Sequence, residues 1–180
     1  GSAGNFSYNL SAYRSDYDNF IQIFFFEPDF NWDFGFPIPS YSSQYQNIES
    51  AEITGFEFRV EYYLGSNVSM FLNGEWMDSE DKSTGDQLRT IQPFNGTLGL
   101  NYYRGDFSLD AMLKWADNMD KNPEGAFTTD SYTTVDVFAR YDFNSRFTVN
   151  LGVLNLFDKD HIEYSYIAGL TGNGKDLSKY

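Results

Sequence analysis

Strict alternation of apolar and polar residues is the feature that most constrains this chain. In residues 147–153, Phe147, Val149, Leu151 and Val153 fall on one face of an extended strand, and polar residues or glycine fall on the other. The same period of two returns along the whole chain. It predicts eight strands, at residues 5–14, 20–27, 54–64, 68–76, 94–102, 107–115, 135–141 and 147–153.

The connections between these strands alternate in length. Short polar turns are expected at 15–19, 65–67, 104–106 and 143–145, and long loops at 28–50, 78–93 and 117–131. Up-and-down outer-membrane barrels have tight turns at one rim and long loops at the other. The pattern therefore predicts an all-β fold, an antiparallel up-and-down transmembrane β-barrel represented by about eight strands. A soluble antiparallel sheet with one polar face is the alternative.

Composition agrees with a barrel wall. The 180 residues are 19% aromatic but only 41% hydrophobic, and no apolar run reaches the roughly 20 residues of a membrane helix. Aromatic residues stand at the expected strand ends, as in an interfacial girdle: Tyr62, Trp76, Tyr102, Phe107, Trp115, Tyr141 and Phe147. The opposite face would line a wet or plugged lumen: Glu57, Arg59, Glu61, Asn73, Glu75, Asn95, Asn101, Asp110, Lys114, Asp136, Arg140 and Asn150.

Charge and residue usage argue against several functions. The net charge of −14 leaves no basic surplus for a nucleic-acid partner. The absence of cysteine removes disulfides and thiolate metal sites. No catalytic spacing of Ser, His and Asp and no glycine-rich phosphate loop is present, so an enzyme is not expected.

Three motifs in order resemble those of TonB-dependent outer-membrane receptors. Residues 5–21 are similar to a strand–turn–strand of that family, residues 45–57 (YQNIESAEITGFE) to a recurring segment, and residues 155–159 (NLFDK) to a motif on the penultimate strand. The resemblance implies a parent with a barrel of about 22 strands, an N-terminal plug and a TonB box. Residues 1–4 would then be a tag remnant or linker, 5–168 the barrel strands and loops, and 169–180 a loop leading to an absent last strand.

Within the family, residues 90–100 and 169–177 look most like the haem and haemoglobin receptors. The resemblance implies an outer-membrane active transporter that takes up haem iron, with haem as the transported ligand. Outer-membrane lipid, the TonB complex and haem or a host haemoprotein would be its partners. A ferric-siderophore receptor is the close alternative. A soluble all-β module that binds sugar or peptide is the distant one.

Three groups of residues are candidates for ligand binding. His161, the sole histidine, is a candidate axial haem ligand with Tyr164 or Tyr166 as second donor, and the alternative is a solvated loop histidine. Trp32, Phe34, Phe36 and Tyr41 concentrate aromatic rings in the loop 28–50, where a ligand would stack, unless the loop packs on itself. Asp78, Glu80, Asp81 and Asp86 offer oxygen ligands for Ca²⁺ but match no defined loop motif, which favours a solvated acidic loop.

Overall fold

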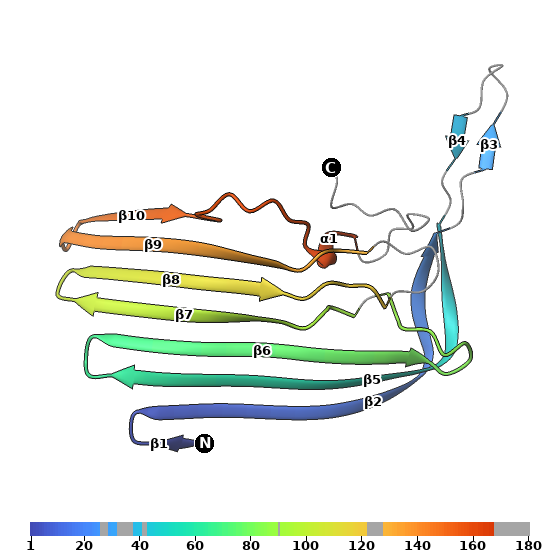
Figure 1. The fold of residues 1–180 in the computed structure, drawn as a ribbon, viewed down its shortest axis with the longest axis horizontal. Helices are drawn as coiled ribbons and strands as arrows, with labels where there is room; N and C mark the ends of the chain where they lie inside the picture. The colour runs from blue at the N-terminus through green and yellow to red at the C-terminus, as the bar shows by residue number, and fades with distance from the viewer. Residues whose placement is uncertain (26–28, 32–37, 41–42, 90, 122–127, 168–180) are drawn as a thin grey trace.

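The computed structural model describes residues 1–25, 29–31, 38–40, 43–89, 91–121 and 128–167. Most of them form one antiparallel sheet of eight strands in the order β1-β2-β5-β6-β7-β8-β9-β10, and the chain between β2 and β5 carries a separate two-stranded sheet (Figure 1). The strands are β1 (Ser2–Ala3), β2 (Phe6–Phe25), β5 (Ser43–Leu64), β6 (Val68–Asp81), β7 (Asn95–Arg104), β8 (Phe107–Ala116), β9 (Tyr132–Asn144) and β10 (Phe147–Val153). The small hairpin of β3 (Asp29–Asn31) and β4 (Ile38–Ser40) stands apart, and α1 (Tyr164–Ile167) has four residues.

The all-β antiparallel prediction is confirmed, and so is the alternation of connections. Tight turns join β5 to β6, β7 to β8 and β9 to β10 at one end of the sheet, whereas the long connections lie at the opposite end (Figure 1). Gly65 and Gly105 have φ of 73° and 58° in two of these turns, a backbone region that glycine enters without steric cost. Among the described residues, no helix is long and apolar enough to cross a membrane.

The expected turn at residues 15–19 is wrong. The strands expected at 5–14 and 20–27 are one continuous strand, β2, so seven long strands build the sheet. Asn19 takes a φ of 57° within β2. Beyond Asn19, the side chains of β2 that face the buried cluster around Ile48 and Leu88 are the even-numbered ones, such as Phe20 and Gln22. A single residue with a left-handed φ thus changes the face of the sheet on which the even-numbered side chains of β2 lie, and the strand continues beyond it. Part of the expected loop 28–50 is also strand, because β5 begins at Ser43.

Two adjacent rows of paired residues define the faces of the sheet. The first row crosses six strands and is entirely apolar: Tyr8, Val60, Leu72, Leu98, Leu113 and Val135. The next row toward the long connections lies on the opposite face and is polar: Asn9, Arg59, Asn73, Thr97, Lys114 and Thr134. We call these the apolar face and the polar face. Large side chains of the apolar face are exposed, Leu10 by 57% and Leu151 by 69%, so they do not form an interior core.

Aromatic rings cover glycines that lie directly opposite them in the sheet. The five pairs are Tyr13 over Gly55, Phe58 over Gly74, Phe71 over Gly99, Trp115 over Gly96 and Phe138 over Gly152. A Cβ at any of these glycines would overlap the ring. Each glycine therefore provides the space in which its partner's ring lies flat along the sheet.

Candidate functional site at the loop end of the sheet

The connection between β6 and β7 folds against the polar face of the β2–β5 pair. Leu88 and Ile91 are 1% and 4% exposed and pack with Ile48 and Ala51 of β5. Phe20, Phe24, Ile53 and Met77 complete the contact as partly buried neighbours. This cluster lies where the long connections meet, and it holds the middle of the β6–β7 connection close to the sheet.

Buried polar groups fix the same connection. The Leu88 amide donates to Ser79 Oγ at 2.9 Å, and the Arg89 amide donates to Gln22 Oε1 at 3.2 Å. Gln22 and Ser79 are 5% and 8% exposed, so these bonds satisfy backbone donors away from water. Burial lowers the pKa of the Arg89 guanidinium below its ordinary value.

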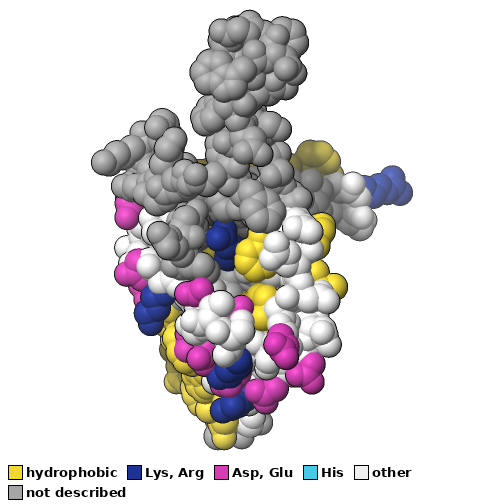
Figure 2. Space-filling view, turned by 90° about the vertical axis from the view of Figure 1, so that its right-hand side faces the viewer, with side chains coloured by type: hydrophobic (Ala, Val, Ile, Leu, Met, Phe, Trp, Pro, Cys, Tyr) yellow, Lys and Arg dark blue, Asp and Glu magenta, His cyan; other side chains and the backbone are white. Residues whose placement is uncertain are grey.

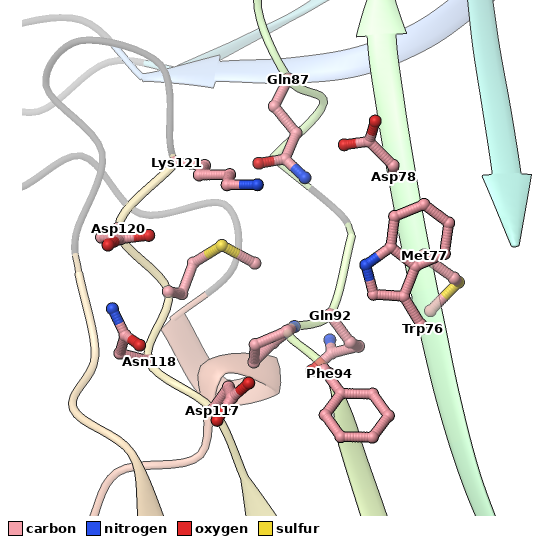
Figure 3. A pocket seen from close by; sticks show the side chains of 12 residues that line it. Trp76, Met77, Asp78, Gln87, Gln92, Phe94, Asp117, Asn118, Asp120 and Lys121 are labelled. Atoms are coloured by element: carbon pink, nitrogen blue, oxygen red, sulfur yellow. The ribbon is translucent and has the colours of Figure 1, made fainter. Parts of the chain in front are cut away.

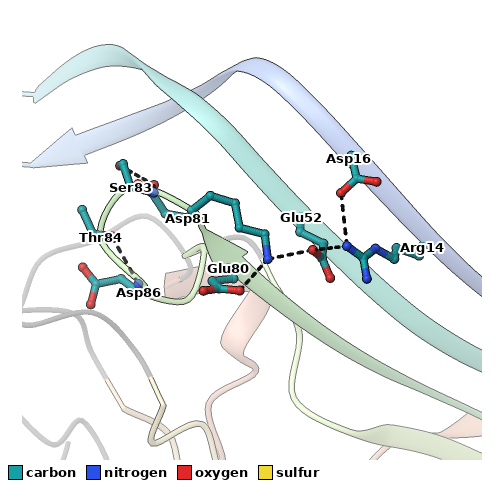
Figure 4. A network of polar contacts seen from close by, with 9 residues as sticks. Arg14, Asp16, Glu52, Glu80, Asp81, Ser83, Thr84 and Asp86 are labelled. Carbon is teal, nitrogen blue, oxygen red and sulfur yellow. Dashed lines mark hydrogen bonds and ion pairs between the residues drawn. The ribbon is translucent and has the colours of Figure 1, made fainter.

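A charged network lies on the apolar-face side, beyond the apolar rows (Figure 4). Glu52 Oε2 lies 2.7 Å from Arg14 Nη2 and 2.7 Å from Lys82 Nζ, and Lys82 Nζ also lies 2.7 Å from Glu80 Oε2. Hydrogen bonds to Glu52 and Glu80 raise the pKa of Lys82. Figure 2, which looks at this end of the molecule, shows charged side chains gathered there.

Two of the four acidic residues considered for Ca²⁺, Glu80 and Asp81, have partners within the protein. Glu80 pairs with Lys82, and Asp81 Oδ1 accepts from the amide and the hydroxyl of Ser83 at 2.8 and 2.6 Å. Within the described part of the chain, no three His, Cys, Asp or Glu residues are grouped so as to hold a metal ion.

The NLFDK motif closes on itself after β10. Asn155 has a φ of 47°, its Nδ2 donates to the Lys159 carbonyl, and its Oδ1 accepts from the Lys159 amide, both at 2.9 Å. The Asn155 amide donates to Asp136 Oδ1 at 2.8 Å, and Asp136 Oδ2 lies 2.6 Å from Lys114 Nζ. Asp136, only 3% exposed, therefore ties the motif to β9 and β8.

The structure gives His161 and Tyr164 different neighbours. The His161 ring packs against Tyr132 with centroids 4.4 Å apart, and its Nδ1 lies 3.0 Å from the Lys159 carbonyl oxygen. Tyr164 is 4% exposed and its hydroxyl donates to the Arg89 carbonyl at 2.8 Å, whereas Tyr166 is 78% exposed. The other predicted ligand residues, Trp32, Phe34, Phe36 and Tyr41, lie outside the described residues.

Among the described residues, cavities open between these connections, and two of them concern the candidate site. One of about 400 Å³ is lined by Trp76 and Met77 of β6, by Gln87, and by the segment 117–121 that follows β8 (Figure 3). A second, of about 290 Å³, is lined by residues that include Gln92, Lys114, Tyr132 and the segment 163–165. The lining of both cavities combines aromatic rings, amides and carboxylates.

Sequence reasoning missed the residues that organise this region. Gln22, Ser79 and Leu88 come from separate segments and match no motif, and only their three-dimensional contacts identify them. Gln22 did carry one signal, a polar residue within an apolar stretch, but the same pattern occurs on any half-exposed strand.

Comparison with known proteins agrees with this architecture. Residues 1–156 match the family model of the TonB dependent receptor-like β-barrel. The vitamin B12 transporter BtuB of Vibrio vulnificus is 28% identical over 153 residues, which cover 85% of this chain and 23% of the relative. The heme/hemopexin utilization protein C of Haemophilus influenzae is 25% identical over 194 residues, covering 97% of this chain and 26% of the relative.

A solved structure of the copper transporter OprC shares the fold, with a TM-score of 0.78 over 91% of this chain and 24% of that chain at 20% identity. The chain thus spans about a quarter of the length of the proteins it matches. Receptors of this family are outer-membrane proteins, and they are transporters and receptors rather than enzymes. With most of its residues matched by the family model, this chain belongs to the TonB-dependent receptor β-barrel family.

Proposed function

We propose that this chain is the wall segment of a TonB-dependent transporter that takes up haem iron, and that its long connections help to admit the ligand. The observation that carries the proposal is the pair of adjacent rows across six strands, one apolar and exposed, the other polar. Such a wall suits lipid on one side and a hydrated lumen on the other.

The dimensions of the apolar face support contact with lipid. Val68 and Trp76 mark the ends of the apolar face on β6, eight residues apart. From Val68 to Trp76 the strand has nine residues, the lower end of the roughly 9–11 that a tilted transmembrane β-strand needs. Beyond Trp76 the same side carries the charged network of Glu52, Glu80 and Lys82, where head groups and water would begin.

Two features favour haem as the ligand to test first. The relative named for heme and hemopexin aligns with 97% of this chain. His161 also lies in the segment after β10, where the long connections gather, and its imidazole is half-buried against Tyr132. An imidazole in that position suits an axial ligand for iron.

The lipid-facing role is tested by size-exclusion chromatography and far-UV circular dichroism with and without detergent. We expect a discrete β-rich peak only in detergent, because the exposed leucines need an apolar environment. A sharp β-rich peak in plain buffer would contradict a lipid-facing wall and would favour a soluble all-β binding module.

The ligand is tested by titrating haem into the detergent-solubilised chain and following the Soret band. We expect a saturable shift that His161→Ala abolishes and that Tyr103→Phe, a change at an exposed ring near the tight turns at the other end of the sheet, leaves intact. A shift that persists in His161→Ala would show that His161 is not the ligand. The absence of any saturable shift would remove haem as a ligand of this segment.

A further inference from the structure

The Tyr164 hydroxyl joins two segments that are far apart in the sequence. It donates to the carbonyl of Arg89, 75 residues earlier, at 2.8 Å, and the bond is buried. One segment is the connection between β6 and β7, and the other is the chain that follows β10. The contact therefore links two long segments at the same end of the sheet, which in the strand order lie on either side of the β8–β9 connection.

The β6–β7 connection also contacts β2, β5 and β6. Leu88 and Ile91 pack on Ile48 and Ala51, and the amides of Leu88 and Arg89 bond to Ser79 and Gln22. These contacts hold the connection from the side of the β2–β5 pair. Tyr164 reaches the same stretch from the segment after β10.

The segment after β10 is held by β9. The Asn155 amide bonds to Asp136, the Leu156 amide donates to the Val135 carbonyl at 2.7 Å, and His161 packs on Tyr132. The helix α1 has only four residues, too few to be stable alone, so its position depends on the contacts of its side chains. Its first residue, Tyr164, is buried.

We propose that Tyr164 is a latch that makes these two segments open and close as one unit, and that the unit sets access to the 290 Å³ cavity. Glu163, Tyr164 and Ser165 line that cavity, and so does Gln92 of the β6–β7 connection. Release of Tyr164 from Arg89 removes a buried hydrogen bond between the segment carrying α1 and the β6–β7 connection. The latch is a property of the chain whichever ligand it admits, and it gives Tyr164 a structural role in place of a ligand-donor role.

Hydrogen exchange read by mass spectrometry tests the latch on the whole chain in detergent micelles, without ligand or TonB. Tyr164→Phe keeps the ring and removes only the hydroxyl, so the Arg89 carbonyl loses a buried donor. We expect exchange to rise about tenfold in both peptides, 82–94 and 155–166, with β7 and β8 unchanged. Tyr166→Phe, at an exposed ring two residues away, should change neither.

A reciprocal variant separates coupling from local loosening. Gln22→Ala removes the acceptor of the Arg89 amide, on β2 and away from α1. Because coupling between two segments is reciprocal, exchange in 155–166 should also rise. If Tyr164→Phe loses its β-sheet signal, Ser79→Ala is measured in its place. This variant removes the acceptor of the Leu88 amide in the same connection, and exchange in 155–166 should again rise. Faster exchange confined to the mutated segment, or no change in Tyr164→Phe, would overturn the latch.

Discussion

The ring of Phe71 lies over Gly99 of the neighbouring strand, in the place where a Cβ of residue 99 would stand. Arg59 lies over the same ring, with its guanidinium carbon 5.0 Å from the centroid. Arg59 in turn forms an ion pair with Glu61 at 2.5 Å. The glycine thus supports an aromatic ring and a cation on the polar face.

Gly99→Ala should destabilise the sheet. The new methyl group must displace the Phe71 ring, and forcing an extra carbon into a packed site costs about 1–3 kcal/mol. The free energy of unfolding in urea, measured in detergent, checks this. Thr97→Ala, on the same strand and the same face but without a covering ring, is the control and should change that energy by no more than about 0.5 kcal/mol. Equal effects of the two substitutions would show that the ring is not constrained by the glycine.

Leu98 and Thr97 are neighbours on opposite faces of β7, so substitution by arginine should have different effects at the two positions. Leu98→Arg places a charge in the middle of the apolar face, where the cost in lipid is about 2–4 kcal/mol. Thr97→Arg places the same charge on the polar face beside Lys114 and Asn73, where water reaches it. Folding yield in lipid vesicles is the measurement. We expect a loss only for Leu98→Arg, and equal yields would contradict the assignment of faces.

Asp136 and Asp142 are two paired carboxylates on β9 that differ in burial. Asp136→Asn leaves Lys114 and the Asn155 amide with a neutral partner in a buried position, and we expect a loss of about 1–3 kcal/mol. Asp142→Asn weakens an exposed pair with Arg140 and should cost no more than about 1 kcal/mol. Urea unfolding monitored by circular dichroism compares them. A larger loss in Asp142→Asn would reverse the assignment of Asp136 as the anchor of the NLFDK motif.

Lys82 should make the stability of the folded chain sensitive to alkaline pH. Its hydrogen bonds to Glu52 and Glu80 raise the pKa in the folded chain above the ordinary 10.5. A cation with a raised pKa contributes its full stabilisation below the ordinary value and loses it as pH rises through the folded value. Melting temperature against pH should therefore fall more steeply above about pH 10.5 in the parent chain than in Lys82→Gln. Parallel curves would show that the network contributes nothing to stability.

The alternation of the sequence predicted the strands and their faces because that information is local. Leu98 and Thr97 are assigned to opposite sides by the pleat alone, and the register of the sheet confirms the assignment. The polar stretch 15–19 has the composition of a turn, yet β2 continues through it. Its pairing with β5 and one left-handed residue, Asn19, override the local preference.

The loop end could not be predicted in the same way. Leu88 is buried because Ile48 and Ala51 lie beneath it, and Arg89 is held by Gln22 and Tyr164, which are 67 and 75 residues away. No periodicity encodes such contacts. His161 could be singled out because it is the sole histidine, but its packing on Tyr132 required the structure.

The pairing of each long strand only with its neighbours along the chain has a consequence for how such walls form and diversify. Every hairpin adds to the one before it, so the sheet can assemble progressively, and the two outermost edges are the last to find partners. An inserted or deleted hairpin would leave all other pairings intact and change only the circumference. In a barrel built this way, the number of hairpins sets the circumference and therefore the width of the interior.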